Sequence, residues 1–172
     1  IDIYGNPVRM SLGQDTLWGN TNHPLWQALL FEQGRILVDI GVDGIAFDDP
    51  FGTSGSIWKG GSFGEPDMSL FRAYLAEDYT SAELLDLFGI ENIETVDYGE
   101  YIRGLGLADT WMTAPWEVPL YDDFNRFQQR ASAAFIARLV SETKRYAETT
   151  YGRTVSFTAN LFGLSAALLI YA

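Results

Sequence analysis

The chain has no cysteine and a single histidine, His23, among its 172 residues. Without cysteine it can form neither a disulfide nor a thiolate metal site, and one imidazole excludes any site that needs two. Basic residues are also scarce, with 11 against 23 acidic ones and a net charge of −12. Because nucleic acids and anionic membranes attract positive charge, we expect neither as a partner.

Several sequence signatures are missing as well. The phosphate-binding patterns G-x-x-x-x-G-K-[ST] and G-x-G-x-x-G do not occur, and neither does the nucleophile elbow G-x-S-x-G. Nucleotide chemistry is therefore unsupported, and we expect no cofactor and no bound metal. No signal peptide is visible, and the apolar run at 164–172 is too short to span a bilayer. Since that run stops without a turn or cap, we expect a fragment of a larger domain.

Hydrophobic residues make up 47% of the chain and aromatic residues 15%, which is enough for a sizeable globular core. The most informative stretch is 41–50, a short apolar run that ends in Asp48 and Asp49. Strand alternation puts Ile45 and Phe47 on one face, and the small residues with Asp48 on the other. This pattern predicts a buried strand that carries an acid to its carboxyl end, where α/β sheets place their active sites.

The flanking segments predict βα repeats. A helix begins at Pro24, with Asn22 or His23 as its cap, and Gly41 ends it. Leu25, Leu29, Ile36 and Ile40 recur in it at helical spacing, as does Trp26. A long helix is predicted from about 120 to 151, followed by a strand at 155–160 whose polar face ends in Asn160. We therefore expect strands 44–48 and 155–160 to be parallel neighbours, with Asp48 and Asn160 at one mouth.

The two predicted strands are about 110 residues apart, against roughly 30 for a simple βα unit. Residues 49–118 are therefore expected to form an enlarged βα loop or inserted subdomain over the barrel mouth. Glycines after Asp49 predict a loop there, and Trp111 and Trp116 fall in a second predicted loop. Between these loops we expect three short helices: at 66–78, from a capping box at Thr80–Glu83 to Gly89, and at 97–103.

The candidate catalytic residues are Asp48 and Asp49. Glycoside hydrolysis uses one carboxyl group to protonate the leaving oxygen and another to attack or to activate water. The alternatives are that the pair caps a loop or ligates a divalent metal. A second carboxylate has no distinguishing signal, and five acidic residues are open candidates: Asp15, Glu65, Asp67, Asp97 and Glu117.

The candidate substrate-binding residues, besides Asn160, are mostly aromatic. Trp18, Trp58, Trp111 and Trp116 fall in predicted loops, where an indole ring can stack on the C–H face of a sugar. The alternative for each is burial under the insertion. His23 is a candidate either as a helix cap or as a substrate ligand.

Residues 22–26 leading to 41–49, then Phe63 with 71–75, resemble the middle of a TIM-barrel glycoside hydrolase of the β-galactosidase-like kind. In that family strand four commonly ends in an acidic pair, and a long loop with an F-r-x-Y-L helix follows. Residues 155–160 look like the next strand, ending in a substrate-contacting Asn. The pair here is Asp-Asp where Asp-Glu is frequent, which leaves the acid and nucleophile roles open.

The resemblance implies that residues 1–172 are part of one catalytic (β/α)8 barrel, a partial TIM barrel of the α/β class. It implies a glycosidase acting on an oligosaccharide or polysaccharide, with Asp48 as a catalytic carboxylate, Asn160 as a substrate ligand and another carboxylate beyond Ala172. Two alternatives stay open. One is a non-catalytic carbohydrate-binding barrel, and the other is a divalent-metal hydrolase that uses Asp48 and Asp49.

Overall fold

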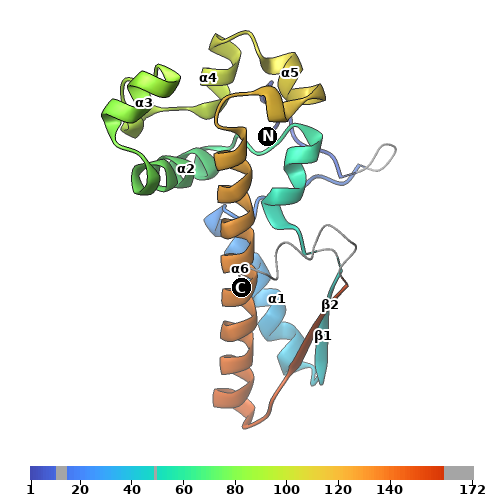
Figure 1. Cartoon of the computed structure of the whole chain (residues 1–172). Helices are drawn as coiled ribbons and strands as arrows, with labels where there is room; N and C mark the ends of the chain where they lie inside the picture. Colours follow the sequence, from blue (N-terminus) through green and yellow to red (C-terminus); the bar gives the residue numbers. More distant parts are fainter. Residues whose placement is uncertain (11–14, 49, 161–172) are drawn as a thin grey trace. The chain divides into compact units, whose positions relative to one another are not determined.

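The computed structural model describes residues 1–10, 15–48 and 50–160. The chain divides into two compact units, and α6 (Tyr121–Tyr151) contributes residues to both. Among the described residues, those within 1–18 and 53–128 form what we call the helical unit, and those within 19–52 and 129–160 form the sheet unit. The architecture is mixed α/β and mostly helical, with two parallel strands (Figure 1).

The helical unit is built from short elements between turns. In chain order these are η1 (Gly52–Lys59), α2 (Glu65–Asp78), α3 (Ser81–Phe88), η2 (Ile93–Thr95), α4 (Tyr98–Gly104), α5 (Ala108–Thr113) and η3 (Pro115–Glu117). Local signals explain several boundaries. Thr80 and Glu83 form the predicted capping box of α3, and Gly89 ends that helix in the left-handed conformation at φ +69°. The three predicted short helices are confirmed as α2, α3 and α4.

The core of the helical unit is aromatic. Phe124, at the start of α6, lies against four rings with centroid separations of 4.9 to 5.8 Å: those of Phe63, Phe71, Tyr98 and Trp111. All five side chains are buried. Edge-to-face and stacked pairs of this kind add to the free energy that burial of the rings already provides.

The sheet unit contains α1 (Pro24–Asp39), β1 (Gly44–Asp48), the continuation of α6 and β2 (Ser156–Asn160). β1 and β2 pair in parallel, with Gly44 opposite Ser156 and Asp48 opposite Asn160. The prediction of two neighbouring parallel strands is confirmed. A (β/α)8 barrel is not seen in the described residues, so the barrel remains a prediction.

The two faces of this sheet differ as the alternation predicts, but the expectation of a buried strand is wrong, because every residue of β1 is at least partly exposed. Ile45 and Phe157 pack toward the helices, against the buried side chains of Val38, Ala147 and Val155. The opposite face, which carries Asp48 and Asn160, is exposed. The helices therefore cover one face of the strands and leave the polar face free.

Close contacts join α1 to α6 and to the segment before β2 in the sheet unit. Gly34 lies against Thr143, so close that a Cβ on Gly34 would be 2.6 Å from Thr143 Oγ1. Arg153, just before β2, donates hydrogen bonds of 2.5 and 2.7 Å to the carbonyl oxygens of Val38 and Val42. The first contact fixes the helix spacing, and the second joins the end of α1 to the segment that leads into β2.

Two local expectations are wrong. The glycine-rich segment after Asp49 contains a 3₁₀ helix, η1, rather than loop alone. Trp111 lies in α5 and Trp116 in η3 rather than in a loop. The helix predicted from Pro24 is confirmed as α1, and its apolar residues Leu25, Leu29 and Ile36 are 46 to 76% exposed. Periodicity identified the helix but could not say what covers it.

No helix within the described ranges is both long and apolar enough to cross a membrane. The predicted terminal run at 164–172 lies outside those ranges.

Candidate functional site

A carboxylate and an amide meet at the carboxyl end of the sheet. Asp48 closes β1, Asn160 closes β2, and the register places them opposite each other. Asn160 Nδ2 donates a hydrogen bond of 3.0 Å to Asp48 Oδ1. Both side chains are exposed, so the second carboxylate oxygen and the amide oxygen of Asn160 can contact a ligand. Asp49, the other candidate acid, lies outside the described residues.

The chain that follows β1 turns back toward the start of α1. Gly52 has φ +54°, and a Cβ there would be 2.8 Å from both Thr21 Oγ1 and Ser132 Oγ. A side chain is therefore excluded by the space as well as by the backbone conformation. The close fit places Gly52 against the turn that precedes α1 and against α6.

His23 caps α1, which is one of the two roles expected for it. Its Nδ1 accepts a hydrogen bond of 3.2 Å from Leu25 N, and the Pro at the first helical position completes the start signal. Asn20 Oδ1 accepts from Asn22 N at 2.8 Å, which stabilises the preceding turn. His23 therefore has a structural partner, and its role toward a substrate stays a prediction.

Trp26, which recurs at helical spacing in the sequence, lies at the surface of the sheet unit. It lies in the first turn of α1 with 38% of its side chain exposed. Its indole covers the backbone of Gly19, where a Cβ would lie 2.2 to 2.6 Å from the ring.

The other tryptophans belong to the helical unit. Trp58 and Trp116 are 57% and 67% exposed, so both offer ring faces to solvent. Trp18 is partly exposed. Trp111 is 1% exposed, its Nε1 donates to Gly60 O at 3.3 Å, and other aromatic rings surround it. Packing accounts fully for Trp111, which leaves no ring face for a sugar.

The five candidates for a second carboxylate also lie in the helical unit. Asp97 caps α4, accepting from Glu100 N at 2.8 Å, and Asp67 is fully buried with Gln128 Nε2 at 3.1 Å. Asp15 pairs with Arg9, Glu65 lies 3.4 Å from Arg72, and Glu117 is exposed in η3. Asp97 and Asp67 therefore have structural partners, whereas Asp15 and Glu65 form exposed ion pairs. No group of three carboxylate or imidazole residues suited to a metal occurs in the part of the chain that the structure describes.

The chain is similar to two alpha-agarases. It is 27% identical over 140 residues to the alpha-agarase of Alteromonas agarilytica, an alignment that covers 73% of this chain and 10% of that protein. It is also 27% identical over 125 residues to the alpha-agarase of Thalassotalea agarivorans, which covers 68% of this chain and 8% of that protein. The chain thus spans about a tenth of the length of these curated relatives. No family model matches it, and no solved structure matches it.

Proposed function

We propose that the chain is part of a carbohydrate-active hydrolase, a glycosidase, and that Asp48 is one of its catalytic carboxylates. The observation that carries this proposal is the Asp48–Asn160 pair at the carboxyl ends of two parallel strands, on the face that the helices leave free. Chemistry in α/β folds is concentrated at that end of the sheet. The similarity to two alpha-agarases supports the same class of reaction.

The fold proposed for the intact site is a (β/α)8 barrel. β1, the α6 helix and β2 form a parallel crossover unit, and such units are the repeat of a barrel. A two-stranded parallel sheet with one exposed face is rarely stable alone, since parallel strands are usually covered on both faces. Further strands at the two open edges would surround Asp48 and Asn160, and residues 49–118 would belong to an enlarged loop at the mouth.

In the reaction, Asp48 would act on the glycosidic oxygen or on the anomeric carbon. As a general acid it would protonate the leaving oxygen, and as a nucleophile it would attack the carbon from the opposite side. Asn160 holds one oxygen of the carboxyl group through its amide hydrogen and can accept a bond from a sugar hydroxyl through its amide oxygen. Within the sheet unit, the exposed ring of Trp26 is the proposed stacking surface for a sugar ring. Trp58 and Trp116 of the helical unit stay predicted sugar-binding residues.

The test compares Asp48→Asn with Asp43→Asn, a matched control just before the other end of β1. Asp48→Asn keeps the shape of the side chain and removes the ionisable group, so turnover on agar should fall by at least ~100-fold. Asp43→Asn should retain full turnover, because Asp43 precedes the strand at the end away from the site. Unchanged turnover in Asp48→Asn would refute the catalytic assignment.

Aryl glycosides with good leaving groups separate the two roles of Asp48. A weakly basic phenolate leaves without protonation, so loss of a general acid should spare these substrates while agar hydrolysis fails. Loss of a nucleophile should slow both. Asn160→Ala should weaken substrate binding by about 1 to 3 kcal/mol because it removes a partner of the carboxylate and of a sugar hydroxyl.

The same measurements identify the alternatives. A non-catalytic carbohydrate-binding barrel would bind agar oligosaccharides, would show no turnover in the unmodified protein and would lose affinity in Asp48→Asn. A divalent-metal hydrolase would lose activity with a chelator and regain it with added Mg²⁺ or Ca²⁺.

A further inference from the structure

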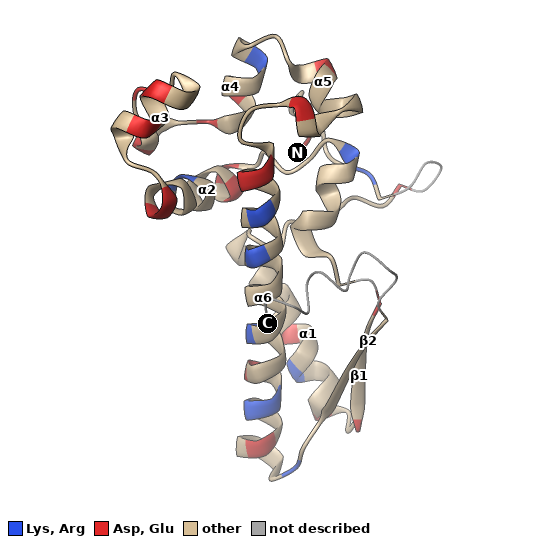
Figure 2. Cartoon of the chain, in the orientation of Figure 1, with Lys and Arg blue, Asp and Glu red and all other residues tan. Residues whose placement is uncertain are grey.

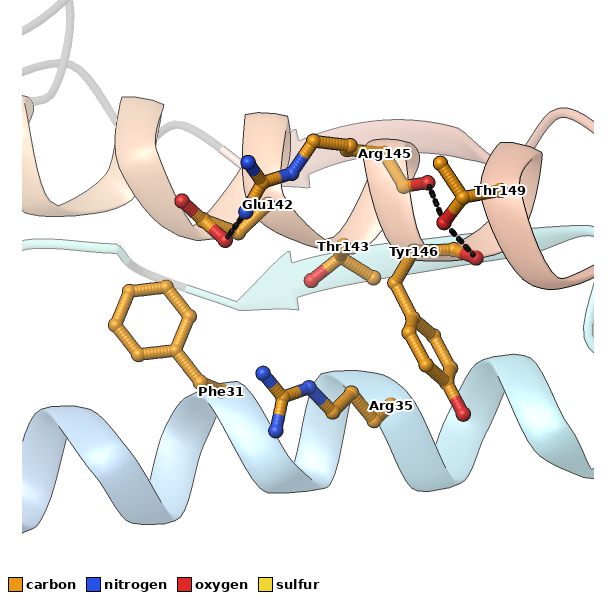
Figure 3. A pocket seen from close by; sticks show the side chains of 7 residues that line it. All are labelled: Phe31, Arg35, Glu142, Thr143, Arg145, Tyr146 and Thr149. Atoms are coloured by element: carbon orange, nitrogen blue, oxygen red, sulfur yellow. Dashed lines mark hydrogen bonds and ion pairs between the residues drawn. The ribbon is translucent and has the colours of Figure 1, made fainter.

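A pocket of about 360 Å³ lies between α1 and α6 in the sheet unit (Figure 3). α1 contributes Phe31 and Arg35 to its lining. α6 contributes the remaining lining residues: Glu142, Thr143, Arg145, Tyr146 and Thr149. Its volume is in the range that binds one or two sugar-sized groups.

Two aromatic side chains face this space from opposite helices (Figure 3). Phe31 packs edge-on against Phe135, with ring centroids 5.9 Å apart, so its orientation is fixed by the unit itself. Tyr146 is held through its hydroxyl, which donates a hydrogen bond of 2.9 Å to Asp39 Oδ1. The pocket is therefore lined by two positioned rings, which suits the apolar face of a sugar.

The charge of the lining is opposite to that of the whole chain. The lining contains two guanidinium groups, those of Arg35 and Arg145, and one carboxylate, that of Glu142. The whole protein has a net charge of −12. Outside the lining, the guanidinium of Arg138 lies 5.3 Å from the centre of the Phe31 ring. Figure 2 shows several basic segments along α6. An excess of positive charge at a concave site favours an anionic ligand.

Arg35 is the group best able to bind such a ligand. Arg145 is engaged by Glu142, whereas the contact from Arg35 to Glu32 is 3.4 Å long and both side chains are more than half exposed. Exposed ion pairs at that separation contribute little free energy, so a better partner can replace Glu32. Arg35 also lies 5.8 Å from the centre of the Tyr146 ring, which orients its guanidinium toward the pocket.

We propose that this pocket binds the anionic group of a charged saccharide, a sulfate ester or a carboxylate, through Arg35, with the sugar ring against Phe31 and Tyr146. Sulfate and carboxylate share the paired oxygens that a guanidinium binds bidentately. The saccharide part of this proposal rests on the proposed function. The anion part rests on the pocket alone, so the two can fail separately.

The test is calorimetric titration of the protein with three oligosaccharides of equal length: a sulfated galactan, a polygalacturonate and an uncharged galactan. We expect at least one charged ligand to bind more tightly than the uncharged one, and Arg35→Gln to weaken that binding roughly tenfold or more, as loss of a charge-assisted hydrogen bond does. Arg9→Gln is the matched control, since Arg9 is an exposed arginine of the helical unit that is paired with Asp15. It should leave the affinity unchanged.

Which charged ligand binds identifies the source of the anion. Equal binding of charged and uncharged ligands, no binding of any charged ligand, or equal losses in Arg35→Gln and Arg9→Gln would each overturn the proposal. Asp48→Asn separates this site from the catalytic one: binding at the pocket should persist in that variant. If the protein hydrolyses no glycoside but still binds a charged oligosaccharide through Arg35, the proposed function fails and the pocket assignment stands.

Discussion

The contact between Gly34 and Thr143 predicts that a normally stabilising substitution will destabilise this protein. Gly34→Ala in the middle of α1 should gain about 1 kcal/mol from helix propensity. Against this, the new methyl group would lie 2.6 Å from Thr143 Oγ1, which is far inside van der Waals contact. Thr143 is buried and β-branched, so its side chain cannot easily rotate away.

The two effects can be weighed. Overpacking of a well-packed contact costs about 1 to 3 kcal/mol, so Gly34→Ala should reduce the free energy of unfolding by about 0 to 2 kcal/mol in total. Thr143→Ala removes the clashing oxygen and leaves only atoms at ordinary contact distances. In that background Gly34→Ala should stabilise by about 1 kcal/mol, because only the propensity gain remains.

The assay is urea unfolding monitored by circular dichroism. It is applied to the unmodified protein, the two single variants and the double variant. The expected coupling energy between the two positions is about 1 to 3 kcal/mol, and the effect of Gly34→Ala should change sign between the backgrounds. A coupling energy within about 0.5 kcal/mol of zero would refute the close packing of α1 on α6. That packing also sets the width of the pocket between these helices, since Thr143 is part of its lining.

The parts of the fold that could be predicted from the sequence are those with local causes. The capping box of α3 marks where that helix begins. Gly89 and Gly41 end helices because they take a left-handed conformation. The alternation in β1 and β2 fixed which residues face the helices. That Asp48 and Asn160 lie at the same end of the sheet followed from the expectation of parallel neighbouring strands, whereas their register is a finding of the structure.

The parts that could not be predicted depend on distant partners. Trp111 lies in a helix of six residues, too short for periodicity to reveal, and its burial follows from rings far along the chain such as Phe63 and Phe124. The exposure of Leu25 and of Trp26 on α1 depends on what lies beside the helix, which a helical repeat does not encode. The pocket between α1 and α6 has the same origin, because it exists only where two helices about 110 residues apart meet.

Two further predictions concern stability. Burial raises the pKa of Tyr98, so its contribution to stability is complete below the ordinary tyrosine value of about 10 and is lost as the pH rises above it. Unfolding free energies measured from roughly pH 8 to 11 should therefore fall more steeply in the unmodified protein than in Tyr98→Phe, and equal slopes would contradict this assignment. Arg153→Lys should lower stability by about 1 to 3 kcal/mol, because an ammonium group cannot reproduce the fork that binds two carbonyl oxygens at the end of α1. Thermal unfolding measures this loss, with Arg9→Lys as the control. Equal unfolding temperatures for the two variants would show that Arg153 does not hold α1 to the segment before β2.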